Sequence, residues 1–135
     1  RETGMGLTVI GAVERENFRV GSSMPGQLIA CIGVPKVGAE VSLDDPETVI
    51  ALLKTLLELD YVSDIIPVGS KGIGYEAGVL AATAGLKAAF DTRLDLEKSA
   101  GPATCLLTSL WPDKLEDLAR AVDRPVAAVG RLIGG

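Results

Sequence analysis

Two glycine-rich segments contain the residues best suited to chemistry, because each combines flexible backbone with a lysine. They are Gly33-Val34-Pro35-Lys36-Val37-Gly38 and Gly69-Ser70-Lys71-Gly72-Ile73-Gly74. Each follows a predicted strand, and the second leads directly into a predicted helix. Glycine lets backbone amides point at a ligand, a helix N-terminus favours an anion, and lysine supplies a charge suited to phosphate. The candidate residues for binding phosphate or substrate are therefore Gly33, Lys36, Gly38, Ser70, Lys71, Gly72 and Gly74.

The same two segments also have an ordinary structural interpretation. Turns of the Gly-Ser-Lys-Gly type are common at protein surfaces, where the lysine is simply solvated. Neither segment matches a Walker A loop or the dinucleotide-binding glycine pattern. The spacing alone therefore leaves phosphate binding and a plain surface turn as alternatives.

Other polar and aromatic residues are weaker candidates. Asp44 and Asp45 could ligate magnesium, although capping of the following helix accounts for them. Tyr75 and Trp111 could stack on a ligand, but lone aromatics near helix starts are usually packing residues. Turn chemistry explains the aspartates expected at strand ends or in loops, Asp64, Asp91 and Asp95. We therefore assign no catalytic residue and no metal ligand from the sequence.

Composition excludes several classes of function. The 135 residues carry 13 Lys and Arg against 18 Asp and Glu, which gives a net charge of −5, and only 4% are aromatic. An acidic chain without a basic tract does not suit nucleic acid or an anionic membrane. The absence of histidine removes Ser-His-Asp triads, Cys-His pairs and histidine metal sites.

The two cysteines and the apolar segments indicate a cytoplasmic protein. Cys31 and Cys105 both lie in apolar stretches, which favours buried reduced thiols, and they are too few for a disulfide framework. The longest apolar segments, such as 77–86, are about half of the roughly 18 residues needed to cross a bilayer. The start at Arg1 shows no export signal and resembles a cut edge of a longer chain.

The predicted elements follow one another as β-β-α-β-α-β-β-α-β. The clearest helix begins at Asp45-Pro46 and has an apolar stripe of Val49, Leu52, Leu53, Leu56 and Leu57. A small-residue helix covers 75–84, with Gly85 as its left-handed cap, and a third begins near Pro112. The predicted strands are 7–13, 27–34, 65–68, 86–90, 105–110 and 126–133. This order predicts a single α/β (α+β) domain whose mixed sheet is packed by about three helices.

Several weak motifs, taken in order, resemble the C-terminal half of the aminoimidazole ribonucleotide (AIR) synthase-related superfamily. The segment 8–14 is similar to the junction strand of that family, and Ser22–Ile29 resembles its approach to the second strand. Gly72-Ile73-Gly74 resembles its glycine-rich helix start. The segments 111–115 and 126–132 are similar to its closing helix and strand.

This resemblance carries expectations about fold and activity. It implies a PurM-like C-terminal domain over residues 15–135, with 1–14 as a junction strand from a missing N-terminal half. That half would bind ATP and Mg²⁺ through acidic residues and form the core of a homodimer. The chemistry would be phosphoryl transfer from ATP to a hydroxyl or an activated oxygen, with Lys36 and Lys71 as phosphate or acceptor contacts. The chain alone would be inactive.

The chain also departs from the family pattern. Gln27 stands where the family has aspartate, the first glycine loop lacks the histidine and asparagine of the family, and the second lacks its aspartate. These replacements are most similar to the α-ribazole kinase branch, which salvages the lower ligand of cobalamin. The same losses would also be expected of a non-catalytic binding or assembly module that keeps the fold. The sequence therefore leaves an ATP-dependent small-molecule kinase or synthase and such a module as alternatives.

Overall fold

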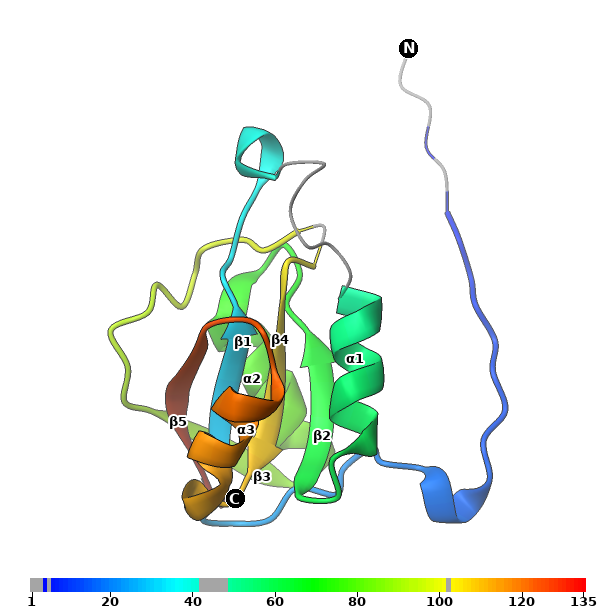
Figure 1. The fold of residues 1–135 in the computed structure, drawn as a ribbon, viewed down its shortest axis with the longest axis vertical. Coiled ribbons are helices and arrows are strands. Elements are labelled where there is room, and N and C mark those ends of the chain that lie inside the picture. The colour runs from blue at the N-terminus through cyan, green and yellow to red at the C-terminus, as the bar shows by residue number, and fades with distance from the viewer. Residues whose placement is uncertain (1–3, 5, 42–48, 102) are drawn as a thin grey trace.

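A five-stranded sheet and three α-helices make up the fold of the described chain (Figure 1). The structure is a computed structural model, and it describes residues 4, 6–41, 49–101 and 103–135. The strands are β1 Leu28–Gly33, β2 Val62–Pro67, β3 Leu86–Phe90, β4 Cys105–Leu110 and β5 Val126–Gly134. The helices are α1 Val49–Glu58, α2 Gly72–Thr83 and α3 Leu115–Ala121. Short 3-10 turns occupy η1 Arg15–Asn17, η2 Gly38–Glu40 and η3 Pro112–Lys114.

The sheet is antiparallel throughout, with strand order β2-β4-β1-β5-β3. The fold class, the single domain and its three helices are confirmed, but the expectation of a mixed sheet is wrong. Strands β1 and β2 are joined through α1 and do run in the same direction. They are not neighbours, however, because β4 lies between them and is antiparallel to both. The crossover therefore skips one position in the sheet and creates no parallel pair.

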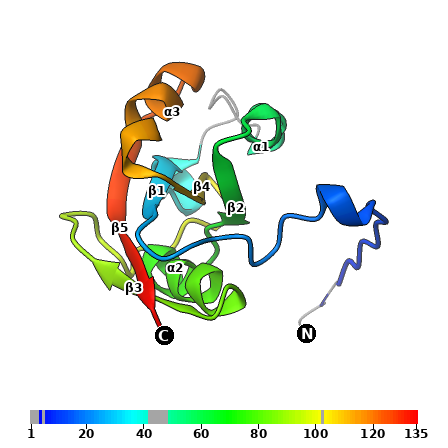
Figure 2. The same cartoon turned by 90° about the horizontal axis from the view of Figure 1, so that it is seen from below.

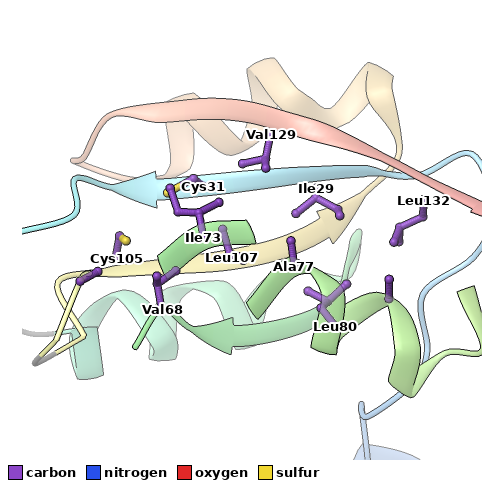
Figure 3. Close-up of a cluster of buried hydrophobic side chains, with 12 residues drawn as sticks. Ile29, Cys31, Val68, Ile73, Ala77, Leu80, Cys105, Leu107, Val129 and Leu132 are labelled. Carbon is purple, nitrogen blue, oxygen red and sulfur yellow. The ribbon is translucent and has the colours of Figure 1, made fainter. Parts of the chain in front are cut away.

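The sheet is covered on both faces, which explains the nearly continuous apolar strands. On one face, α2 packs against alternate residues of β1 and β4; on the other, α1 and α3 pack against the residues between them (Figure 2). Figure 3 shows the first cluster, where Ile29 and Cys31 of β1 lie above Ile73, Ala77 and Leu80 of α2. The small residues of α2 thus allow close approach to the sheet, as predicted.

Most predicted elements are confirmed, with small shifts at their ends. Strands β3 and β4 have the predicted limits, while α2 begins earlier than predicted, at Gly72. Gly85 has a φ of +71° after α2, as expected of a left-handed cap. Leu57 of α1 is 47% exposed, so the buried stripe of that helix is narrower than predicted. The predicted start at Asp45-Pro46-Glu47, together with Asp44, lies outside the described residues.

Residues 7–13 form no strand, contrary to prediction. They run in extended form away from the sheet, and Leu7, Val9 and Ile10 are 84–90% exposed (Figure 1). A β-branched sequence becomes a strand only where a neighbouring strand satisfies its backbone groups, and the structure offers none here. The assignment of residues 1–14 to a preceding half of the protein stays a prediction.

The linker that leads into β1 is attached to the sheet by a buried carboxylate, Asp64. This residue lies within β2 and is only 5% exposed, so its interpretation as a turn residue is wrong. Its two oxygens accept hydrogen bonds from the backbone amides and hydroxyls of Ser22 and Ser23, at 2.5–3.1 Å. Nearby, the Gln27 side chain accepts from the Met24 amide and donates to Ser63 Oγ. Four donors satisfy the Asp64 carboxylate, which is what a buried charge requires.

None of the described helices is long and apolar enough to span a bilayer.

Candidate functional site

The two glycine loops leave the sheet at the same end. Gly33, the last residue of β1, pairs with Cys105, and Pro67, the last residue of β2, pairs with Leu106. Both loops therefore start beside the first residues of β4, toward the top of Figure 1. We call the loop 33–38 the first loop, the loop 69–74 the second loop, and the end of the sheet that carries them the rim.

A threonine side chain fixes the first loop. The Thr104 hydroxyl donates to the Val34 carbonyl and accepts from the Lys36 amide, both at 2.9 Å. Gly33 has a φ of +92°, and a Cβ at that position would lie 2.8 Å from the Thr104 carbonyl oxygen. Glycine is thus required here because the backbone is left-handed and another backbone segment lies against it. After the loop, η2 begins at Gly38.

Backbone contacts hold the second loop. Gly72 has a φ of +82°, and an added Cβ would lie 2.6 Å from the Leu96 carbonyl oxygen and 2.9 Å from that of Glu97. The Gly74 amide donates to the same Leu96 oxygen at 2.8 Å, and the Ala100 amide donates to the Gly69 oxygen at 3.0 Å. One amide in the first turn of α2 is therefore already used by a carbonyl of its own chain.

The side chains of the second loop are also in contact with neighbours. The ammonium group of Lys71 lies over the ring of Tyr75, 4.1 Å from its centre, which is a cation–π contact. A Cβ on Gly69 would lie 3.2 Å from a carboxylate oxygen of Glu76. The entrance to α2 thus holds a lysine, an aromatic ring and a carboxylate.

A third segment, residues 96–101, joins the two loops, and we call it the strap. It supplies the Leu96, Glu97 and Ala100 backbone groups that contact the second loop. Its Lys98 side chain forms an ion pair with Glu40 in η2, at 3.0 Å. The Thr104 amide then donates to the Ala100 oxygen at 3.0 Å, which connects the strap to the residue that fixes the first loop.

The sequence indicated the two loops, whose role as a site stays a prediction, but it did not indicate Lys98 or Thr104. Both are distant from the loops they contact, since Thr104 is 70 residues from Val34 and Lys98 is 58 residues from Glu40. No local signal identified Lys98. The position of Thr104 directly before a buried strand was the one available hint. Of the aromatic candidates, Tyr75 lies at the rim, whereas Trp111 follows the opposite end of β4.

Charge at the rim is mixed. The pKa of the Glu40 carboxyl is lowered from its ordinary value, mainly by the hydrogen bond from Lys98 and next by the hydrogen bond from the Val37 amide.

Beneath the rim, Cys31 and Cys105 are buried and form no disulfide, as predicted. Their mutual hydrogen bond and burial raise the pKa of Cys105, so it remains a thiol. Among the residues that the structure describes, no three potential ligands from His, Cys, Asp and Glu gather into a metal site.

Neither family models nor curated proteins match this sequence. Solved structures do match its fold. HypE of E. coli, a hydrogenase maturation protein, has a TM-score of 0.67 at 15% identity, covering 84% of this chain and 46% of its own. PurL of T. maritima complexed with ATP has a TM-score of 0.70 at 15% identity, and the match covers 91% of this chain and 24% of PurL. Phosphoribosylformylglycinamidine synthase II of Thermotoga maritima has a TM-score of 0.69 at 17% identity, and the match covers 90% of this chain and 24% of the synthase.

The chain spans less than half the length of each of these solved proteins. At such low identity the likeness concerns the fold. HypE and PurL are members of the AIR synthase-related superfamily. The chain therefore has the PurM-like C-terminal fold that its motifs led us to expect.

Proposed function

We propose that this chain is the C-terminal half of an ATP-dependent small-molecule kinase or synthase. The observation that carries the proposal is that both glycine-lysine loops, which are far apart in sequence, lie at one end of a sheet with the PurM-like fold. Solved neighbours with this fold include PurL complexed with ATP and with ADP, which supports a nucleotide-dependent reaction. The rim would form one wall of the cleft in which the reaction takes place.

The residues of the rim suit the binding of a phosphate or a polar acceptor. Lys36 and Lys71 would neutralise negative charge there, as point charges suited to phosphate oxygens. Following the resemblance to the AIR synthase-related superfamily, we assign Mg²⁺ and most ATP contacts to a preceding half, which would also form the homodimer core. ATP supplies the phosphoryl group, and the task of this half is to hold and orient the acceptor. We place the protein in the cytoplasm, where its unpaired cysteines would stay reduced.

The first acceptor to test is α-ribazole. The lack of histidine and asparagine in the first loop and of aspartate in the second is most similar to the α-ribazole kinase branch. The test is an assay of the full-length protein for ATP-dependent phosphorylation of α-ribazole. Lys36→Ala and Lys71→Ala should each lower kcat/KM by roughly tenfold or more, because a lost charged hydrogen bond is worth about 1.5–3 kcal/mol.

Lys54→Ala is the matched control, because Lys54 is an exposed lysine on α1 outside the rim. Its kinetics should equal those of the unmodified protein. Unchanged kcat and KM in both Lys36→Ala and Lys71→Ala would remove these lysines from the site. This chain assayed without a preceding half should show no turnover.

A non-catalytic binding or assembly module is the second candidate. The observation that favours it is at the start of α2, where the Gly74 amide already donates to the Leu96 carbonyl and is therefore not available to bind a phosphate. A reading frame that continues upstream into an acidic half, and ATP turnover by the full-length protein, would favour the enzyme. Fold and partner binding without ATP turnover would favour the module.

A further inference from the structure

We propose that Thr104 and the strap couple the two glycine loops, so that the conformation of one loop is set by the other. This inference deepens the proposed function, on which its meaning for ligand binding rests. The coupling itself is a property of the ligand-free chain and can be tested without any substrate.

The first half of the connection is the Thr104 side chain. One hydroxyl donates to the carbonyl of Val34 and accepts from the amide of Lys36, so it holds the backbone on either side of Pro35. Pro35 is buried between them, although the loop lies at the surface. A displacement of Thr104 therefore has to displace Lys36 as well.

The second half of the connection is the backbone of the strap. Ala100 accepts the Thr104 amide with its oxygen and donates its own amide to Gly69. Four residues earlier, the Leu96 oxygen accepts the Gly74 amide and lies against Gly72. An unbroken series of hydrogen bonds thus leads from Val34 through Thr104 and Ala100 to the second loop.

The backbone at Ala103 is strained. Ala103 has a φ of +66°, the one non-glycine residue with positive φ in the described chain. Such a conformation costs of the order of 1–2 kcal/mol and persists where surrounding contacts impose it. The contacts that impose it here are those of Thr104 on one side and Ala100 on the other, which is what a coupled element requires.

For the proposed enzyme, coupling means that a ligand ordering one loop would order the other. Binding at the first loop would restrict Thr104, and through Ala100 it would restrict the Gly69 and Gly74 backbone. The two lysines would then act on one ligand together.

The test is amide hydrogen exchange in the ligand-free protein, measured by NMR for unmodified chain, Thr104→Val and Thr104→Ser. Valine keeps the shape of threonine but loses both hydroxyl bonds, whereas serine retains the hydroxyl. Thr104→Val should speed exchange of the Gly74 and Ala100 amides by roughly fivefold, which is the effect of losing about one hydrogen bond. The Thr104 hydroxyl bonds neither of these amides, so such an effect would have to be transmitted through the strap. Thr104→Ser should restore slow exchange.

Thr55→Val is the matched control, because the Thr55 hydroxyl donates to the Ala51 oxygen within α1. It should leave the Gly74 and Ala100 amides unchanged. If Thr104→Val accelerates only the Lys36 amide, the two loops are independent and the proposal is wrong.

If Thr104→Val does not fold, Lys98→Ala gives the second test, with faster exchange expected at Val37 and at Ala100. If the full-length protein shows no turnover in the kinase assay but Thr104→Val still changes exchange in both loops, only the proposed function is overturned.

Discussion

The two glycine loops both combine glycine with one lysine, but they are held by different kinds of contact. A threonine hydroxyl and an exposed ion pair fix the first loop and the turn that follows it. Backbone carbonyls packed directly against glycine hold the second loop. A backbone oxygen also lies against Gly33, but a Cβ there would meet it alone within 3 Å, whereas a Cβ on Gly72 would meet three backbone atoms of Leu96 and Glu97 within that distance. The second loop therefore has less room for adjustment. The second loop is thus the rigid wall of the rim and the first loop the adjustable one.

Substitution of Gly72 should have the largest effect on stability. In Gly72→Ala the new Cβ would lie 2.6 Å from the Leu96 oxygen, in a left-handed conformation. Strain and overpacking together should lower the free energy of unfolding by about 3 kcal/mol or more, measured by urea denaturation. Gly78→Ala is the control in the same helix, since nothing lies within 4 Å of its added Cβ. It should raise the free energy of unfolding by about 0.5–1 kcal/mol, because alanine is the better helix former.

Substitution of Gly33 should have a smaller effect, and this difference tests the contrast between the loops. Gly33→Ala brings a Cβ to 2.8 Å from the Thr104 oxygen at a φ of +92°. We expect a loss of about 2 kcal/mol in unfolding free energy, because the first loop can shift where the second cannot. Gly38→Ala, also at positive φ but with no atom within 4 Å, should cost about 1 kcal/mol. A loss at Gly33 as large as that at Gly72 would contradict the contrast.

Relief of strain next to Thr104 should stabilise the chain. Ala103→Gly lets the residue adopt its φ of +66° without a Cβ penalty. The free energy of unfolding should rise by about 0.5–1 kcal/mol, seen as a higher urea midpoint with an unchanged slope. Ala121→Gly, in α3 where the backbone is helical, should instead lower it by a similar amount. A destabilising Ala103→Gly would show that the turn is not strained.

Local pattern predicted the strands and helices well, because apolar periodicity and glycine or proline punctuation are properties of neighbouring residues. It failed where the answer depends on distant residues. Asp64 was interpreted as a turn residue because its partners, Ser22 and Ser23, lie about 40 residues away. The sheet was expected to be mixed because nothing local shows that β4 inserts between β1 and β2. The two loops were predicted from their glycine and lysine content, and their role as a binding site stays a prediction. Thr104 was not predicted, because it lies 70 residues from Val34, which it contacts.

The ion pair between Lys98 and Glu40 should have the smallest effect, strongest at the first loop and weaker along the strap. The pKa of Glu40 is lowered by hydrogen bonds from Lys98 and the Val37 amide, with smaller contributions from the charges of Lys98 and Lys36. A carboxyl whose pKa is lowered by folding contributes stability above its ordinary pKa of 4.5 and loses it as pH falls through the folded value. Exchange of the Val37 amide should therefore accelerate, relative to its intrinsic rate, as pH falls below about 4.5.

Glu40→Gln should remove this pH dependence, because the amide keeps a hydrogen-bond acceptor but does not titrate in that range. High salt should weaken the pair in the unmodified protein as well, since both side chains are partly exposed to solvent. Arg120→Ala, which breaks ion pairs with Glu116 and Asp117 on α3, is the control and should leave the Val37 amide unchanged. Acid-induced loosening that appears equally at Gly74 would mean that the backbone contacts of the second loop depend on this ion pair, and the contrast between an adjustable and a rigid wall would then be lost.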